Sequence, residues 1–403
     1  MIQLGRWEAG SGERGAGRFT LLSLFLLTAL GSRSLYSQQT PVDSGPLPPP
    51  TTWLTSYLPF IGAAPNDIPA IQFRWRRWLM ADYDDRVTAR QTFNAMASYT
   101  FKGGWLVGVR YDGPGLSDGW RLRASIAAAR DVRYGYFGLG NNTEIDKDLA
   151  DDTQPYLYRM RRRRIFGTGE LSRRITGPLW AAALINVTDA QYTALPGPSV
   201  FRTDFGSQLD EDEISGRLAL IYDTRDTEYD TRRGLLAEAG IQYADHANNN
   251  YTRWYGIVRG WVPVKNGIVL AGRVLASDIR GSATLDSRYE LPAWDRTVAL
   301  LGGEDSHRSL DNGRFAGTGA LVANVEARIP LKSFGDYGAI NLLLFADAGR
   351  VYEGERLRLV TDDFTTGGGF GLGIRVLRGN IFTLNLGFGP DGQNFSARTG
   401  WMF

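Results

Sequence analysis

The side chains most often used in catalysis are scarce in this sequence. The chain has no cysteine and only two histidines, His246 and His307, among 403 residues. A nucleophilic site needs a serine or thiol, a histidine and a third group that orients the histidine. His246 falls in a predicted loop, and His307 stands beside an arginine. We therefore expect no catalytic residues, and the chain is predicted not to be an enzyme.

Two further stretches could bind a ligand, and neither has the required spacing. The run "GGGFGLG" (367–373) is rich in glycine, but no helix follows it to hold a phosphate, so a smooth strand surface is expected. The run "LDEDE" (209–213) lacks the spaced Asp or Asn residues and the glycine of a calcium loop. We predict no cofactor and no metal site.

The first 67 residues are predicted to lie outside the folded domain. Arg14 and Arg18 precede an apolar run (19–30) and small residues, which is typical of a signal peptide over 1–37. This leader has a net charge of +2, equal to that of the whole chain, so the mature protein is near neutral and nucleic acid is not an expected partner. Residues 38–67 are rich in proline and are predicted to form a periplasmic linker or strap.

From residue 68 to residue 403, apolar and polar residues alternate. In "WLVGVRYD" (105–112), Val107 and Val109 share one face, whereas Arg110 and Asp112 share the other. The same pattern recurs in the stretches 120–128, 370–376 and 381–389. One face is always aliphatic or aromatic and the other is polar or glycine, which indicates lipid outside and water inside a transmembrane β-barrel.

The connections also favour a barrel. Short turns near 102–104, 176–178, 264–267 and 378–380 alternate with longer loops near 141–155, 193–212, 281–317 and 350–365. Outer-membrane barrels have short periplasmic turns and longer extracellular loops. We predict an all-β antiparallel barrel of about 16 strands over 68–403, in the bacterial outer membrane, with both ends of the chain periplasmic.

The last ten residues, "NFSARTGWMF", also alternate. Phe395, Ala397, Thr399, Trp401 and Phe403 fall on one face. We predict a final strand whose Phe403 lies in the aromatic girdle at the periplasmic interface.

One run does not fit a strand that crosses lipid. "YRMRRRRIFG" (158–167) has arginines on both faces, and an outward arginine at mid-bilayer costs about 2–4 kcal/mol. Either the strand extends beyond the outer leaflet, or its arginines contact anionic lipid headgroups.

Four stretches carry motifs. They are "YDTRDTEYDTRRGLLAEAGIQYA" with Asp223, Arg225, Asp226 and Gly234, "LLGGEDSHRSLDNGRFAG", "ANVEARIPL", and "LLLFADAGRVY" with Phe345, Asp347 and Gly349. Together they resemble the BamA/TamA family of bacterial surface-antigen barrels. The resemblance is to the subgroup lacking N-terminal POTRA domains, since the stretch before residue 68 is too short to hold them. The ending with Trp401 and Phe403 is similar to the C-terminal assembly signal of such barrels, with Arg398 at its usual glycine position.

The resemblance also implies a lock inside the barrel. The family's sixth extracellular loop folds inward, and its arginine corresponds to Arg308, followed here by Ser309 and Leu310 instead of glycine and an aromatic residue. Asp347 would be its strand partner, with Glu326 nearby. Alternation independently aims Glu326 and Asp347 at the lumen. The alternative is that these are ordinary solvated charges.

The family's role gives the functional expectation. The resemblance implies protein insertion or translocation at the outer membrane, with a separate periplasmic or lipoprotein partner in place of the POTRA domains. The alternative is a passive pore or a structural anchor that moves no protein. Outer-membrane lipids are expected partners, with lipopolysaccharide among the candidates.

Overall fold

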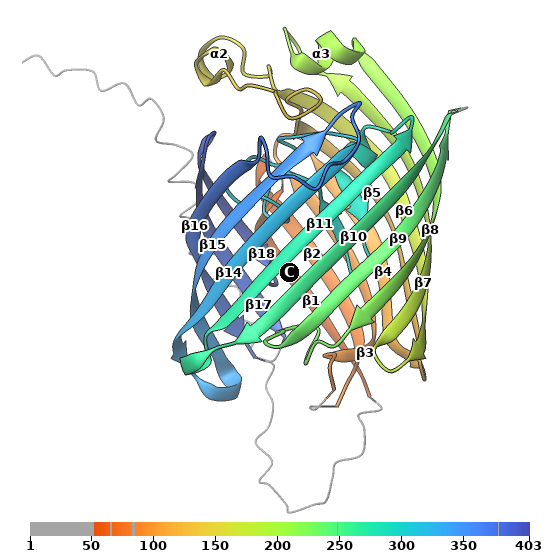
Figure 1. Cartoon of the computed structure of the whole chain (residues 1–403), viewed down its shortest axis with the longest axis vertical. Coiled ribbons are helices and arrows are strands. Elements are labelled where there is room, and N and C mark those ends of the chain that lie inside the picture. Colours follow the sequence, from red (N-terminus) through yellow and green to blue (C-terminus); the bar gives the residue numbers. More distant parts are fainter. Residues whose placement is uncertain (1–51, 65–66, 83–84, 248, 378) are drawn as a thin grey trace, which may run out of the picture.

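The computed structural model describes residues 52–64, 67–82, 85–247, 249–377 and 379–403 (Figure 1). The predicted signal peptide (1–37) and residues 38–51 of the predicted linker lie outside the described residues. Within the described ranges, no helix is both long and apolar enough to cross a membrane.

One antiparallel sheet of sixteen strands curls into a barrel (Figure 1). Its first eight strands are β1 (Trp53–Ala64), β2 (Asp67–Met80), β3 (Ala89–Thr100), β4 (Trp105–Ser117), β5 (Trp120–Gly135), β6 (Arg159–Thr176), β7 (Leu179–Ala194) and β8 (Gln208–Asp223). The remaining eight are β9 (Gly234–His246), β10 (Asn249–Pro263), β11 (Val269–Gly281), β14 (Gly319–Ser333), β15 (Gly338–Tyr352), β16 (Thr365–Val376), β17 (Asn380–Gly389) and β18 (Gly392–Thr399). The predicted all-β barrel of about 16 strands is confirmed.

The other elements are short and belong to the connections. They are α2 (Lys147–Asp152), α3 (Val200–Phe205), the 3-10 turns η1 (Lys265–Gly267), η2 (Asp286–Arg288) and η3 (Gly335–Tyr337), and a separate hairpin of β12 (Glu290–Pro292) and β13 (Thr297–Ala299). We call the 282–318 connection, which contains η2, β12 and β13, the inner loop.

The two ends of the barrel differ in their connections. The connections 136–158, 195–207, 282–318 and 353–364 lie at one end, named here the long-loop end, which carries α2 and α3 at the top of Figure 1. The opposite short-turn end carries tight connections such as 118–119, 177–178 and 334–337. The start of β1 and the end of β18 both lie at the short-turn end.

Two sequence predictions about the beginning of the barrel are wrong. The barrel begins at Trp53 and not at residue 68, so the predicted linker (38–67) contains strand β1. The linker was predicted from the proline-rich composition of residues 38–67, but Pro59 is tolerated in β1 because this edge strand pairs only with β2. Sequence analysis also grouped the 102–104 turn with the short periplasmic turns. With β1 counted, this turn joins β3 and β4 and lies at the long-loop end.

The alternation predicted from the sequence is confirmed in the wall. Val107 and Val109 are each 53% exposed, and Leu218 and Leu220 are also exposed on the outside. Arg217, the residue before Leu218 on the same strand β8, is buried in the interior. The apolar face therefore points outward and the charged face lines the lumen.

The sheet has two free edges. Among the described residues, β1 is hydrogen-bonded only to β2, and β18 only to β17. We call the junction between β1 and β18 the seam. Fifteen ladders thus hold the described wall, and none of them joins the two strands of the seam.

Candidate functional site: a locked loop inside the barrel

The structure brings Arg308, Asp347 and Glu326 together inside the barrel. The Arg308 guanidinium donates from Nε to Oδ2 of Asp347 at 3.0 Å and from NH2 to Oδ1 at 2.9 Å. Its backbone N–H also donates to Asp347 Oδ2, at 2.9 Å, and its NH1 donates to Glu326. All three side chains are at most 3% exposed. We call this group the lock.

Neighbouring strand residues hold the lock in place. Asn324 and Asp347 face each other across β14 and β15, and Asn324 donates to both Asp347 (2.8 Å) and the Ser306 carbonyl (2.6 Å). Arg328 donates to the second oxygen of Glu326 at 2.9 Å. Phe345 lies beneath the arginine, with the guanidinium carbon 3.8 Å from its ring centroid. Each carboxylate is therefore shared between Arg308 and a second donor.

The lock is held by attraction between opposite charges although it is buried. Asp347 and Glu326 accept from the same guanidinium, so the positive charge has two negative partners within hydrogen-bond distance. A buried arginine with two carboxylate partners is stabilised as a unit, and removal of one partner leaves an uncompensated charge.

Glycines in the wall make room for the loop. A Cβ atom at Gly387 would lie 2.7 Å from the Arg308 carbonyl oxygen, and one at Gly349 would lie 2.9 Å from Leu301. Gly367 and Gly389 both face the Ser309 side chain. Part of the glycine-rich run thus forms the smooth inner wall expected from the sequence. Ser309 is only 2% exposed, and Leu310 is fully buried in the apolar core of the inner loop.

A second set of contacts holds the other side of the inner loop. Asp286 pairs with Arg162 of β6 at 3.0 Å, and Asp295 pairs with Arg259 of β10 at 2.6 Å. Trp294 donates from its backbone N–H to Glu238 at 2.9 Å and from its indole to Ser172 at 3.0 Å. Sequence analysis missed this anchor, although alternation could have shown that the wall partners face inward. The loop is consequently fastened to opposite parts of the wall.

The arginine run in β6 is divided between the two faces. Arg162 and Arg164 point inward and pair with Asp286, Arg164 at 3.4 Å. Arg163 is exposed on the outer face, and Arg161 is half-buried there. The inner half of the run therefore serves the loop anchor.

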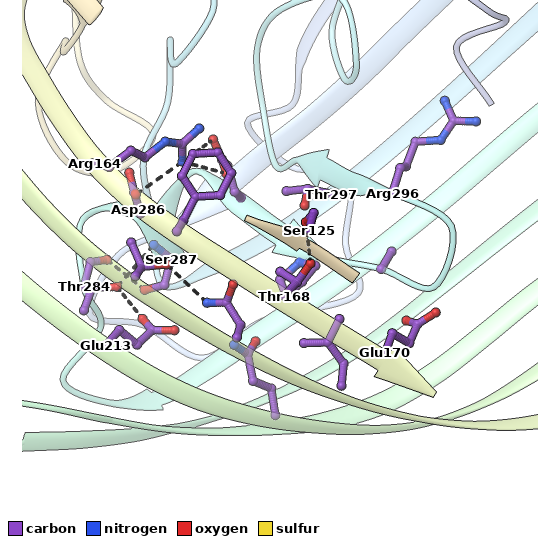
Figure 2. A pocket seen from close by; sticks show the side chains of 18 of the residues that line it. Ser125, Arg164, Thr168, Glu170, Glu213, Thr284, Asp286, Ser287, Arg296 and Thr297 are labelled. Atoms are coloured by element: carbon purple, nitrogen blue, oxygen red, sulfur yellow. Dashed lines mark hydrogen bonds and ion pairs between the residues drawn. The ribbon is translucent and has the colours of Figure 1, made fainter. Parts of the chain in front are cut away.

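A polar cavity of about 550 Å³ remains beside the inner loop (Figure 2). Figure 2 shows Arg164, Glu170 and Glu213 of the wall around it, with Thr284, Asp286 and Ser287 of the loop. Thr284 donates to Glu213 at 2.8 Å. The cavity is thus bounded by both the wall and the inner loop.

The Asp-x-Arg-Asp motif lies at the short-turn end and not in the lock. The Arg225 guanidinium donates two hydrogen bonds to the Asp223 carboxylate, at 3.0 and 3.1 Å. Asp226 accepts from the backbone N–H groups of Thr227 and Arg232, which closes the β8–β9 turn. Gly234 has a φ of 118°, and a Cβ there would collide with the Thr224 carbonyl. The motif shapes this turn.

The predicted position of Phe403 in an aromatic girdle is wrong. Strand β18 ends at Thr399, and Gly400, with a φ of 87°, turns the chain into the lumen. Phe403 is 4% exposed and packs with Trp180, Trp261 and Trp294. Its carbonyl oxygen accepts from Arg328 at 2.9 Å. Alternation in β18 would place Phe403 on the outer face, but its contacts with these interior residues hold it in the lumen.

Trp401 is fixed in the same interior region. Its indole N–H donates to Asp230 of the β8–β9 turn at 2.8 Å, and Arg328 stacks on its ring. Asp230 also lies 3.8 Å from Arg375. We call residues 400–403 the tail. The tail links the last strand to the motif turn.

Ser309 and Ser117 each have one feature of a catalytic serine, but neither has the other groups that such a serine needs. Ser309 lies 3.1 Å from Nδ1 of His307, yet the other ring nitrogen meets the Thr365 carbonyl and not a carboxylate. The stretch 115–119, "GLSDG", matches the Gly-x-Ser-x-Gly pattern, which sequence analysis overlooked. It lies in the tight β4–β5 hairpin, whereas a nucleophile elbow joins a strand to a helix.

Comparison with known proteins agrees with this architecture. The model of the Omp85 superfamily domain matches residues 91–394, well over half of the chain. BamA from Haemophilus ducreyi lacking POTRA domains 1–3 is similar in structure, with a TM-score of 0.53, 11% sequence identity, and coverage of 87% of this chain and 70% of that chain. CdiB from Escherichia coli has a TM-score of 0.54 and 11% identity, with coverage of 94% and 69%. No curated protein matches the sequence.

These matches confirm the resemblance to BamA/TamA barrels that the four motif stretches indicated. The fold, the inward arginine loop and the superfamily match lead to one conclusion. The chain belongs to the Omp85 superfamily and is an outer-membrane β-barrel.

Proposed function

We propose that this barrel inserts or translocates proteins at the outer membrane, using the seam as the site where the wall opens. The observation that carries the proposal is the contrast between the seam and the rest of the wall. In the described part of the chain, each other pair of neighbouring strands is joined by a ladder, but β1 and β18 are not. Opening a wall at an unpaired junction breaks fewer hydrogen bonds than opening it elsewhere.

The inner loop and the tail both occupy the lumen, which supports this proposal over a passive pore. The inner loop is anchored on two sides, and the tail crosses to the wall near Trp180 and Trp261. A static channel needs a continuous water-filled path, whereas a lateral route does not. An exposed strand edge can also pair with an incoming extended segment.

The proposal includes a partner and an orientation. We place the long-loop end outside the cell and the short-turn end in the periplasm, as outer-membrane barrels have their short turns on the periplasmic side. A separate periplasmic protein or lipoprotein would then deliver substrates to the short-turn end. No catalytic site is needed, because the barrel would act by strand pairing and exclusion from lipid.

A reversible cross-link across the seam tests the proposal. The chain has no native cysteine, so paired cysteines can be placed along β1 and β18, for example at Tyr57 and Phe395. In native host cells, oxidation should stop the accumulation of dependent proteins in the outer membrane or medium, and reduction should restore it. Quantitative proteomics of both fractions gives the readout.

A matched control uses two strands that are already paired. Phe73 of β2 faces Ala97 of β3, so a disulfide there adds the same chemistry without touching the seam. It should leave protein accumulation unchanged. If the locked seam supports full function, or steady ion conductance continues unchanged by the cross-link, the barrel is a pore or anchor.

A further inference from the structure

Alternate arginines of strand β6 point to opposite faces of the wall and differ in whether they have acidic partners. Arg162 and Arg164 point into the lumen and are neutralised by Asp131, Asp286 and Glu290. Arg161 and Arg163 point outward, and neither forms an ion pair with an acidic side chain within the described ranges. The Nε atom of Arg161 is buried without a hydrogen-bond acceptor. The inward pair thus has a structural role that the outward pair lacks.

The outward arginines belong to a larger basic surface. Arg163 lies directly opposite Arg130 on β5, and Arg130 lies opposite Trp105 on β4. The Arg130 guanidinium reaches the β3–β4 turn near Gly103, beside the exposed Lys102. We call Lys102, Arg130, Arg161 and Arg163 the basic patch. Like charges directly opposite each other on a sheet are destabilising, so an anion between them would relieve a cost present in the bare protein.

The basic patch lies at the upper edge of the apolar outer surface. The next outward row towards the short-turn end contains Val107, Ala128 and Ile165 in register across the same three strands. Val107 and Ile165 are both well exposed. An anion bound here would therefore sit at the boundary between hydrocarbon and water, where Trp105 is also favoured.

We propose that the basic patch binds the phosphate groups of an anionic lipid headgroup, at the long-loop end of the barrel. Arginine forks match phosphate oxygens in geometry and charge. A lipid satisfies both halves of the surface, because its phosphate meets the arginines while its acyl chains cover the valine and isoleucine below. A free phosphate ion leaves that apolar row unused.

Neighbouring strands limit the site on one side. Gln191 of β7 faces Arg163, and Asp189 of β7 faces Ile165. On β8, Asp210 faces Gln191 and Asp212 faces Asp189. These outward carboxylates repel phosphate, so the headgroup lies over β4–β6 and not over β7–β8.

Lipid retention by the purified barrel tests the site. The full chain in mixed micelles is titrated with a diphosphorylated lipid A or with its dephosphorylated form, and bound lipid is counted by native mass spectrometry. The double variant R161Q/R163Q should bind the phosphorylated lipid about thirtyfold more weakly, since each basic residue near the headgroups contributes on the order of 1 kcal/mol. Binding of the dephosphorylated lipid should not change.

Two controls separate the site from general charge effects. R173Q/K332Q removes two charges near the opposite end of the barrel, from the ends of β6 and β14, and should leave retention unchanged. D189N removes a neighbouring negative charge and should not lower it. Heat-modified migration on gels verifies that each variant is folded.

Three outcomes would overturn the inference. They are unchanged retention in R161Q/R163Q, an equal loss in R173Q/K332Q, and displacement of the lipid by inorganic phosphate at millimolar concentration. The assay involves neither the seam nor substrate proteins, so its failure is distinguishable from failure of the proposed function.

Discussion

Arg308 shows how one guanidinium can fix a loop of more than thirty residues. Its donors are divided between Asp347 and Glu326, and its face lies on the Phe345 ring. Lysine has one point charge and cannot make the paired contact with Asp347. The geometry of the lock therefore depends on the planar fork as well as on the positive charge.

A double-mutant cycle measures the lock. Arg308→Ala and Asp347→Ala should each destabilise loop docking by about 3–5 kcal/mol, because each leaves a buried charge without its main partner. The double variant should cost little more than the worse single variant. Limited proteolysis of the inner loop in intact outer membranes gives the readout, and Arg308→Lys should restore protection only in part. Independent, additive effects would mean that the two residues are not coupled.

Acidification should affect docking of the inner loop through two residues, His307 and Glu304, whose effects are opposite. Burial lowers the pKa of His307, with a smaller opposing effect of Asp347, so the docked loop favours neutral histidine. Docking is then complete above the ordinary histidine pKa and weakens as the pH falls. Burial raises the pKa of Glu304 to about 7, so this carboxyl group favours docking when protonated and weakens it as the pH rises.

Single variants separate these two effects. Glu304→Gln removes the opposing carboxyl group, so on acidification from pH 7.5 to pH 5.5 the apparent Tm should change less favourably than that of the parent chain. His307→Gln removes the opposing imidazole, so over the same interval the apparent Tm should change more favourably than that of the parent chain. Heat-modified gel migration across the pH series gives both values. The same slope in both variants would contradict the assignment.

At the scale of elements, the wall and the inner loop fit because several wall positions have no side chain. Gly387 of β17 lies against the backbone of Arg308 and Ser309. Gly169 of β6 faces outward, and a methyl group added there would have no other atom within 4 Å. The two glycines are alike in sequence but differ in what a methyl group would meet.

This contrast predicts different responses to alanine. Gly387→Ala should destabilise loop docking by about 1–3 kcal/mol, because a backbone collision cannot be relieved by rotating a side chain. Gly169→Ala should have no measurable effect. Protease sensitivity of the inner loop compares the two directly. Equal sensitivity would show that the loop does not pack against β17.

The sequence correctly predicted the features that depend only on residues close together in the chain. Strict alternation placed Glu326 and Asp347 in the lumen and the valines of β4 outside, because a strand has a period of two. Strand β1 was missed because residues 38–67 are rich in proline, which is unfavourable in a strand with two neighbours. The inward turn at Gly400 depends on distant partners, Arg328 and Asp230, which no local pattern reveals.

At the scale of the whole molecule, the strand count decides which connections share an end. With β1 included, the 102–104 turn joins the long loops, and the 264–268 and 377–379 turns lie opposite. The orientation proposed here then assigns each turn to one side of the membrane.

Cysteine labelling in intact cells tests this topology. Cysteines at Lys102, Asp148 and Glu355 should react with a membrane-impermeant reagent, because these exposed positions lie at the long-loop end. Cysteines at Asn266 and Gly379 should react only after the outer membrane is permeabilised. The cysteine-free parent chain gives the background. Labelling of Asn266 but not Asp148 in intact cells would invert the orientation.

The unequal lengths of the strands have a consequence for the surrounding bilayer. Strand β6 has 18 residues and β18 has 8. At about 3.3 Å per residue and a tilt near 45°, β6 reaches roughly 40 Å along the membrane normal and β18 less than about 20 Å. The apolar band of outer-membrane barrels is about 25 Å tall, so lipid beside β18 must thin or deform to match it. The molecule thus imposes a one-sided hydrophobic mismatch, and the seam lies beside the thinnest lipid.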